Sequence, residues 1–498
     1  MQLIYFMKFI HLPAAVLILF SLSACRNESA DTDLAMLLAA GSTLTQESYG
    51  FLNMSSFCSS PNNFWARNLV SNSSDCIDAS LRGQGTHVDV YVDNTLTTPL
   101  NYQNIADQFD TVIKPRSDAA FGLPTDINSD GKVTILILDI VDGATQNSGF
   151  VAGFFDPVDF LSDDPLYQIR SNERELLYMD GAELVTLLSS DPNAFLSTVA
   201  HEYQHLIRHQ YQIIQNFSDA TWINEGTSEV ASDISGYGPQ TSRMDCFNGT
   251  TCYPGVNGTS LFSWSNTLLQ YAYAYGVMAY LYHSSGTNDT EKQGFIHETV
   301  TGSGGTRAVN ADNLISVFKS SSTTYSAANF PAGTDNNTVY KSLLASFLAR
   351  TINNSDLTNT YLGTTTATNI DVTRTAYPLP ASGELDGFYG TSGLGYYMTP
   401  GTAYPSSPYY VNGSSTGTGN PDVVIINNPV TTPPGGEHIL FNGAFLTGGS
   451  VTPYSVLTPA AVPKWETPAH GKHCPIDHLT KMHRIEKMIL RTHPALQR

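Results

Sequence analysis

Two histidines separated by three residues constrain this chain of 498 residues more than any other feature. His201 and His205 lie one helical turn apart, so both imidazoles project from the same face of a helix. With this spacing one helix can supply two nitrogen ligands to a single Zn²⁺. Glu202 lies between them, and Glu225 follows twenty positions after His205. The sequence therefore predicts a zinc site with two histidines and a carboxylate as ligands.

Each residue of this motif has a predicted part in peptide hydrolysis. A three-ligand zinc with an open position activates water and helps to stabilise the oxyanion. We expect His201, His205 and Glu225 to be the ligands. Glu202 would take the proton from the water as general base and pass it to the leaving amine. A ligand histidine also needs a partner for its other ring nitrogen, and Glu229, one turn after Glu225, is expected to orient His201.

The charge balance limits the partners that the chain can have. It carries 44 acidic and 24 basic residues, which gives a formal net charge of −20. Nucleic-acid backbones are bound by clustered Lys and Arg, so we exclude nucleic acid as the natural partner. Protein or peptide substrates fit this balance, and we expect a monomer.

The N-terminal segment is predicted to be a targeting signal and is left out of the fold. Lys8 precedes an apolar run over residues 14–22, which is too short for a comfortable transmembrane helix. The following Ser-Ala-Cys resembles a bacterial lipobox, so Cys25 is the predicted lipidation site. The expected location is the bacterial cell envelope, as an outer-membrane or cell-surface lipoprotein that could also be released. The alternative is an ordinary signal peptide with an incidental cysteine, and translation could start at Met1 or Met7.

Cysteine usage agrees with an oxidising compartment. The simplest local disulfides are Cys58–Cys76 and Cys246–Cys252, which leaves Cys474 unpaired. The sequence has no Cys-x-x-Cys pair, so a thiolate zinc cluster is not expected.

Hydrophobic patterning predicts an α+β fold. Residues 87–92 alternate as a half-buried strand does, and the β-branched run 133–140 predicts a buried strand. Residues 149–157 and 175–180 are further strand candidates. The second could pair with an extended peptide substrate if it were exposed, although an ordinary sheet strand is the simpler interpretation. Asp191 and Pro192 predict the start of the two-histidine helix, and further helices are expected at 102–112, 222–234, 268–282 and 338–351.

Shifts in composition divide the chain into five parts. They are a lipoprotein signal peptide at 1–24, a tether and disulfide-clipped lead-in at 25–85, the zinc metallopeptidase domain at 86–355, a β-rich accessory region at 356–465, and a basic, histidine-rich tail at 466–498. Short apolar runs between Pro/Gly turn clusters predict the accessory region. The tail is expected to be disordered.

An acidic loop precedes the strand at 133–140. Asp126, Asn128 and Asp130 have the spacing of calcium-loop positions 1, 3 and 5, and a glycine follows at position 6. Position 12 is Ile137 instead of glutamate, and a strand follows where an EF-hand has a helix. We therefore favour a turn built from Asx residues and glycine, with a structural Ca²⁺ site as the alternative.

Around the two motifs the sequence resembles the gluzincins, the thermolysin-type zinc metallopeptidases. The resemblance is carried by His-Glu-Tyr-Gln-His at 201–205 and by Asn224, Glu225 and Glu229. It implies that Glu225 is the third ligand and that the acidic residue four positions later, usually Asp in the family, contacts a ligand histidine. It also implies a zincin-like catalytic domain with a mixed sheet, an active-site helix and a helical lower part.

More specifically, the chain resembles the hyicolysin family of secreted bacterial metallopeptidases. The matching stretches are 126–140, 149–159 and 222–231, and the resemblance covers about residues 86–350. It does not extend to the lead-in or to the C-terminal region.

Gluzincins also use a tyrosine or histidine from outside the metal helices to hydrogen-bond the oxyanion. A Tyr-Ala-Tyr-Ala-Tyr-Gly segment here is similar to the tyrosine-bearing helix of the aminopeptidase branch. Tyr271 and Tyr273 are the two candidates that this similarity offers, and His283 and His297 are weaker ones. The alternative is a row of aromatic residues in the core.

Three functions are compatible with these observations. The first is a surface-anchored zinc endopeptidase that acts on extracellular proteins. The second is an adhesin or binding lipoprotein whose metal site is vestigial or structural, but a structural site has no use for the base Glu202. The third is an exopeptidase.

Overall fold

The computed structural model describes most of the chain between residues 58 and 325 and parts of the chain beyond. The described residues are 58, 60–144, 149–164, 169–215, 219–252, 255–262, 264–325, 335, 336, 339, 340, 343, 344, 347, 348, 351, 361–366, 369–375, 408–411, 423–427 and 437–442. The chain divides into Met1–Ser59 and Ser60–Arg498, and every element below belongs to the second unit. The predicted signal peptide, Cys25, Cys474 and the tail lie outside the described residues.

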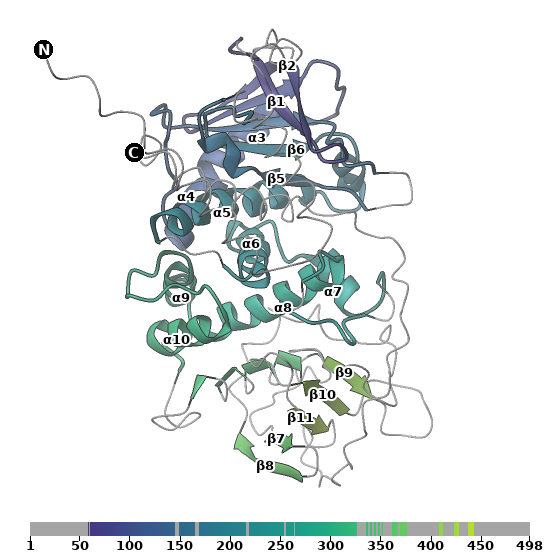
Figure 1. Cartoon of the computed structure of the whole chain (residues 1–498), viewed down its shortest axis with the longest axis vertical. Coiled ribbons are helices and arrows are strands. Elements are labelled where there is room, and N and C mark those ends of the chain that lie inside the picture. The colour runs from purple at the N-terminus through teal and green to yellow at the C-terminus, as the bar shows by residue number, and fades with distance from the viewer. Residues whose placement is uncertain are drawn as a thin grey trace, which may run out of the picture. The chain divides into compact units, whose positions relative to one another are not determined.

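A six-stranded mixed sheet is built from the first part of the described chain (Figure 1). Its strands are β1 (Asn63–Asn68), β2 (Ser73–Gln84), β3 (Val88–Asp93), β4 (Val133–Leu138), β5 (Gly153–Phe155) and β6 (Leu176–Asp180). They lie in the order β1-β2-β3-β4-β6-β5. The strands β3, β4 and β6 are parallel, and β1, β2 and β5 are antiparallel to their neighbours. This sheet and its helices are compatible with the predicted α+β class.

Strand β4 is buried on both faces and contributes to two cores. All six of its residues are buried. Because side chains alternate along a strand, Ile135 and Ile137 enter the large core that includes the helices. Leu136 and Leu138 enter a smaller core with Phe64 of β1. Burial on both faces explains why this strand is a continuous apolar run.

Eight α-helices lie within residues 102–321 of the described chain. They are α3 (Tyr102–Gln108), α4 (Lys114–Phe121), α5 (Ala194–Gln215), α6 (Thr221–Ser235), α7 (Thr241–Phe247), α8 (Leu268–Ser284), α9 (Asp289–Thr301) and α10 (Ala311–Ser321). A π-helical segment, Phe109–Ile113, joins α3 to α4, and short 3₁₀ helices cover Pro157–Phe160 and Leu184–Ser189. The described residues within 336–351 are also helical.

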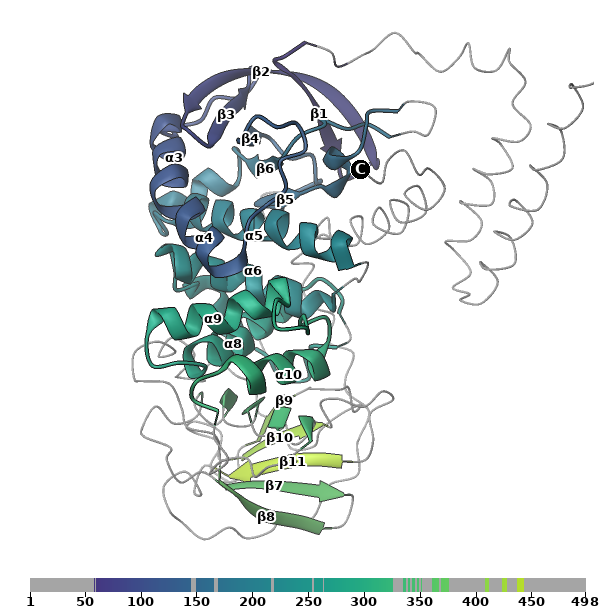
Figure 2. The ribbon, with the colours of Figure 1, turned by 90° about the vertical axis from the view of Figure 1, so that its left-hand side faces the viewer.

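The helices α5, α6 and α8 lie in successive layers beneath the sheet. Helix α5 packs on β5 and β6, α6 packs on α5, and α8 packs on α6 (Figure 1). Helix α9 contacts both α8 and α10, as Figure 2 shows from the side. The two-histidine helix is therefore held between the sheet and a helical layer.

The first two strands continue the sheet across the boundary expected at residue 85. Strand β2 pairs with β3, with Ala79 opposite Asp93. In addition, Arg67 of β1 forms buried ion pairs with Asp156 and Asp159. Residues 63–68 and 73–84 are thus part of the six-stranded sheet. Strand β2 has no regular apolar alternation that would reveal it in the sequence, because most of its residues are exposed or half-buried.

The strand considered for pairing with a substrate is an inner strand. Strand β6 lies between β4 and β5, and all five of its residues are buried. The ordinary sheet strand that the sequence favoured here is therefore confirmed, and the alternative of an exposed strand is wrong. Among the described strands, β5 is at this edge of the sheet.

The disulfides and a second sheet complete the described structure. Cys246 and Cys252 form a disulfide, and Cys58 and Cys76 are disulfide-bonded as well. A five-stranded antiparallel sheet has the order β8-β7-β11-β10-β9. Its strands are β7 (Tyr361–Thr366), β8 (Asn369–Thr375), β9 (Pro408–Val411), β10 (Val423–Asn427) and β11 (Glu437–Asn442). No helix among the described residues is long and apolar enough to cross a membrane.

Candidate metal centre

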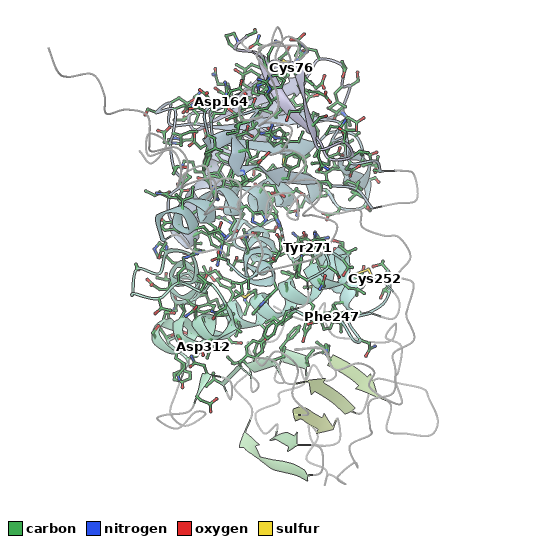
Figure 3. All side chains as sticks on the ribbon, viewed as in Figure 1. Cys76, Asp164, Phe247, Cys252, Tyr271 and Asp312 are labelled. Atoms are coloured by element: carbon green, nitrogen blue, oxygen red, sulfur yellow. A yellow bond between two sulfur atoms is a disulfide. The ribbon has the colours of Figure 1, made fainter. Side chains whose placement is uncertain are left out.

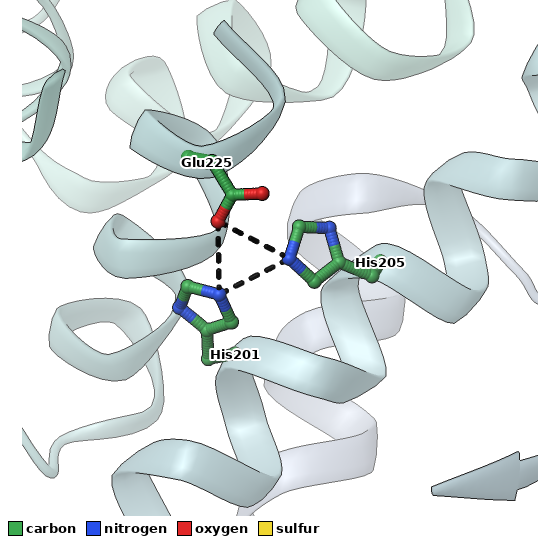
Figure 4. A group of neighbouring side chains, drawn as sticks. All are labelled: His201, His205 and Glu225. Carbon is green, nitrogen blue, oxygen red and sulfur yellow. Dashed lines mark hydrogen bonds and ion pairs between the residues drawn. The ribbon is translucent and has the colours of Figure 1, made fainter. Parts of the chain in front are cut away.

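The packing of α5 against α6 brings the two sequence motifs together. One face of α5 is fully buried in the large core, with Val199, Tyr203 and Leu206 among its residues. Helix α6 is capped at its C-terminal end by Gly236, which adopts the left-handed conformation (φ 84°) that favours glycine at a helix end. The short connection between the helices lets α6 return along α5, so that Glu225 faces the two histidines (Figure 4).

Three ligand atoms converge on one point in the site. Nε2 of His201 and Nε2 of His205 are 3.1 Å apart. Oε2 of Glu225 lies 3.4 Å from the first nitrogen and 3.5 Å from the second. Ligands about 2.0–2.2 Å from a tetrahedral zinc lie about 3.3–3.5 Å from one another. The spacing of His201, His205 and Glu225, which we call the triad, therefore fits a single zinc ion.

The buried carboxylate of Glu225 supports the same conclusion. Glu225 is 0% exposed, and neither of its side-chain oxygens has a hydrogen-bond partner. Burial acts to raise the pKa of Glu225, but His205 and His201 outweigh it and hold the pKa at about 2. Burial likewise acts to lower the pKa of His201, whereas Glu225, Glu202 and Glu229 raise it to about 9. The pocket thus favours positive charge, as a divalent cation requires.

Glu202 lies beside the triad and is only 6% exposed. Burial raises the pKa of its carboxylate, although His201 and His205 act in the opposite direction. A carboxylate with a raised pKa is a stronger base. The environment of Glu202 is therefore suited to accepting a proton.

The orientation of His205 depends on residues that the sequence did not single out for this role. Its Nδ1 lies 3.2 Å from Oδ1 of Asn224 and 3.1 Å from Oγ of Ser228. With the proton on Nδ1 directed at Asn224, Nε2 keeps its lone pair for a metal. Ser228 in turn donates to the side chain of Gln204. Asn224 and Ser228 both lie in the Asn-Glu-Gly-Thr-Ser-Glu segment, so this motif carries the partners of His205 together with Glu225.

Glu229 lies on the other side of the site, near His201. Its Oε2 is 3.9 Å from Nδ1 of His201, beyond hydrogen-bond distance. Its Oε1 accepts a hydrogen bond from Nε of Arg243 at 2.7 Å. Arg243 also lies over the ring of Tyr271, 5.8 Å from its centroid. Nothing in the local sequence around Arg243, on the separate helix α7, indicated this contact.

The two candidate tyrosines have different surroundings. Tyr271 lies against Arg243 and packs edge-on against Trp264, with ring centroids 5.2 Å apart. Tyr273 is fully buried, and its ring lies 6.1 Å from that of Phe247 in the core. In the view of Figure 3, Tyr271 lies nearer the six-stranded sheet than Phe247 does. Through Arg243 and Glu229, contacts link Tyr271 to the vicinity of the triad.

A buried ion-pair network fixes the connection between the motif helices. Arg208 of α5 is fully buried and pairs with Asp219 in the loop before α6, with Nε and Oδ2 2.5 Å apart. Arg307 pairs with the other oxygen of Asp219 at 2.5 Å. Nη2 of Arg208 also donates to the carbonyl of Ala308 at 2.9 Å. These contacts join α5, the interhelix loop and the segment before α10, and they define how α6 returns along α5.

Gly226, next to Glu225, permits the close packing of α6 on α8. A Cβ atom at this position would lie 2.8 Å from the carbonyl oxygen of Ala274 and 2.5 Å from Cγ of Met278. We expect Gly226→Ala to lower the free energy of unfolding by about 1–3 kcal/mol because the two helices must separate. Denaturant unfolding measures this.

Gly294 in α9 gives a matched control for that substitution. A Cβ atom at Gly294 would meet nothing within 4 Å. Gly294→Ala should therefore raise the free energy of unfolding by about 0.5–1 kcal/mol through helix propensity alone. If Gly226→Ala and Gly294→Ala changed the free energy of unfolding equally, close packing at Gly226 would be contradicted.

Outside the three side chains of the candidate centre, a second acidic group includes Asp180, which has structural contacts. Asp139, Asp180 and Glu183 form a second carboxylate group, but Asp180 accepts backbone N–H groups of Leu184 at 2.7 Å and Ala182 at 3.2 Å. Its role is therefore to hold the turn after β6. The predicted turn from Asp126 to Gly131 also forms, and is described below.

The sequence is similar to that of a known peptidase, although no family model matches it. It is 29% identical over 238 residues to the neutral metalloprotease ShpI of Staphylococcus hyicus. The matched region covers 45% of this chain and 52% of that protein, so the chain spans about half the length of its relative. This homology supports a metallopeptidase family and implies a metal cofactor, typically zinc.

Proposed function

We propose that this chain is a zinc endopeptidase of the gluzincin type that cleaves extracellular proteins. The observation that carries the proposal is the convergence of His201, His205 and a buried Glu225 whose oxygens have no hydrogen-bond partner. A metal cation bound between this carboxylate and the two histidines would balance its buried charge. The similarity to a metalloprotease supports the same function.

The residues around the triad divide the work of hydrolysis among them. His201, His205 and Glu225 would hold zinc, which supplies an electrophile that acidifies water and polarises a carbonyl. Glu202 accepts the proton of the attacking water and delivers it to the leaving amine. Tyr271 is our candidate for donating a hydrogen bond to the developing oxyanion. Asn224 keeps His205 in the required tautomer.

The edge strand β5 offers an approach for an extended peptide. It lies against α5, and a Cβ atom at Gly153 would come within 3.0 Å of Cγ2 of Thr198, one turn before His201. A peptide that adds to the edge of the sheet would bring its backbone near the triad. This geometry favours cleavage inside a chain over removal of single terminal residues.

We also propose that the enzyme acts outside the cytoplasm and is anchored to a bacterial membrane through a lipid on Cys25. The disulfide-bonded cysteines support an oxidising compartment. The second candidate function, an adhesin or binding lipoprotein, would use the region beyond residue 355. The buried base Glu202 favours the enzyme, because a structural metal site does not need it.

Metal removal and re-loading tests the proposed function. We expect a chelator to abolish cleavage of an unfolded protein and of a peptide blocked at both ends, because the ligands alone cannot activate water. Stoichiometric zinc should restore both activities. Activity on the blocked peptide separates an endopeptidase from an exopeptidase. A zinc-loaded, folded protein that cleaves neither substrate would argue for the binding function instead.

A further inference from the structure

The acidic loop before β4 is not used by the proposed chemistry. Its side chains are exposed and bend the backbone into a turn. Asp126 accepts the N–H groups of Asp130 and Gly131, at 3.1 and 3.2 Å. Asn128 accepts the N–H of Asp130 at 3.2 Å. Three oxygen-bearing side chains are therefore gathered at one loop.

Glu175, the residue before β6, brings a further carboxylate to this loop from a distant part of the sequence. Its Oε1 accepts the N–H of Ile127 at 2.7 Å. The residue is 1% exposed, and its Oε2 is buried without a hydrogen-bond partner. A buried carboxylate oxygen without a partner is costly. The hydrogen bonds of the turn leave Oε2 of Glu175 unsatisfied, so a positively charged ligand beside the loop would stabilise this carboxylate.

The surrounding charges favour a cation. Burial raises the pKa of Glu175 to about 7; backbone hydrogen bonds lower it, and the charges of Asp126 and Asp130 raise it. Lys132 follows the loop, but its ammonium group pairs with Asp89, with Nζ and Oδ1 2.7 Å apart. The lysine is thus held by another carboxylate and does not serve as the counter-ion of Glu175.

We propose that this loop and Glu175 form a calcium-binding site. An EF-hand calcium loop has a glutamate at position 12, where this loop has Ile137. Glu175, directly before β6, supplies the missing carboxylate from another part of the chain. Ca²⁺ takes six to eight oxygen ligands, including carboxylates, amides and main-chain carbonyls, in flexible geometry. The loop offers Asp126, Asn128, Asp130 and the carbonyl of Lys132 at the corresponding positions.

Binding would require the oxygens of the loop and of Glu175 to come closer together. The carboxylate oxygens of Asp126, Asp130 and Glu175 are not all within 4.8 Å of one another, unlike the ligand atoms of the zinc triad. An ion would draw the exposed loop toward the buried Glu175. Because the loop leads into β4 and Glu175 into β6, the ion would join the starts of two paired strands. Its expected effect is therefore on the stability of the sheet.

Calcium titration of the full-length, zinc-loaded protein tests the proposal. In calcium-free buffer containing zinc, calorimetry with CaCl₂ should show one binding event, and the thermal unfolding temperature should rise. MgCl₂ should bind more weakly, because Mg²⁺ requires a stricter octahedral geometry. No heat and no thermal shift up to about 10 mM CaCl₂, well above the affinity of extracellular calcium modules, would overturn the proposal.

Glu175→Gln distinguishes the site from an ordinary turn. The amide can still accept the N–H of Ile127 but loses the charge, so calcium affinity should fall at least about tenfold. Without calcium this variant should be as stable as the wild type or more so, because it removes a buried carboxylate. Asp130→Asn, at an exposed position, should also weaken binding. Calcium affinity like that of the wild type in Glu175→Gln would overturn the proposal.

Glu183→Gln is the matched control. Glu183 belongs to the other acidic group, with Asp139 and Asp180, and its side chain makes no capping hydrogen bond. Its substitution should leave calcium affinity unchanged. If Glu183→Gln lost as much calcium affinity as Glu175→Gln, the net charge of the protein, and not the proposed site, would determine calcium binding.

Discussion

Glu202→Gln is expected to abolish proteolysis while the protein keeps its zinc. The amide has nearly the shape of the carboxylate but cannot accept the proton of the attacking water. Loss of a general base lowers the rate by roughly 10²–10⁴-fold. Because the triad of His201, His205 and Glu225 does not include Glu202, metal content should stay at one zinc per chain. The turnover of a blocked peptide and elemental analysis of the same sample measure the two quantities.

The outcome for this variant also discriminates between the candidate functions. Glu183→Gln serves as control, since it removes a carboxylate outside the triad and should leave turnover unchanged. If Glu202→Gln retains activity within about tenfold of the wild type, the base is another residue. If the variant loses its zinc as well, Glu202 holds the metal site together and the assignment of roles fails.

Glu225→Ala is expected to lose zinc and, with it, all activity. The substitution removes one of three ligands and the negative charge that attracts the cation. An orienting residue outside the ligand set typically contributes 10- to 100-fold to metal affinity, so a direct ligand should cost more than about 100-fold. Competition with a chromophoric zinc chelator measures the affinity. The wild type and the variant should be compared at the same pH, because zinc competes with protons for the histidines.

Glu229→Gln is the comparison for the third ligand. Its Oε2 lies 3.9 Å from Nδ1 of His201, while its Oε1 pairs with Arg243. We expect an affinity loss of roughly 10- to 100-fold, smaller than that of Glu225→Ala. If Glu229→Gln lost as much zinc affinity as Glu225→Ala, the assignment of Glu225 as a ligand and of Glu229 as a residue outside the ligand set would be contradicted.

Strong local patterns predicted the elements that carry the site. The apolar run of β4, the two-histidine helix α5 and the helix α6 all lie where periodicity and composition indicated. The strands β1 and β2 escaped prediction, because β2 exposes much of its surface and joins the sheet through main-chain pairing with β3. The ordinary sheet strand favoured at residues 175–180 is confirmed. Its exposed alternative is wrong, since strand order depends on how distant segments pair.

The networks around the site were beyond the reach of sequence patterns. Arg208 and Arg307 pair with Asp219 across 11 and 88 residues. Arg243 approaches Glu229 from a separate helix. A charged residue that is buried by its partners has the same local signature as one that is exposed to solvent. Only the packing of helices on one another reveals which charges are paired.

The sequence by itself determined the motif of the candidate metal centre, because the spacing of His201, Glu202 and His205 along one helix is a local property of the chain. The tertiary structure decided the rest. It brought Glu225 within 3.5 Å of both histidines, separated Tyr271 from the core position of Tyr273, and set the carboxylate of Glu175 against a loop some fifty residues earlier in the chain. Such contacts form between segments far apart in sequence, and they follow from packing that no local pattern encodes.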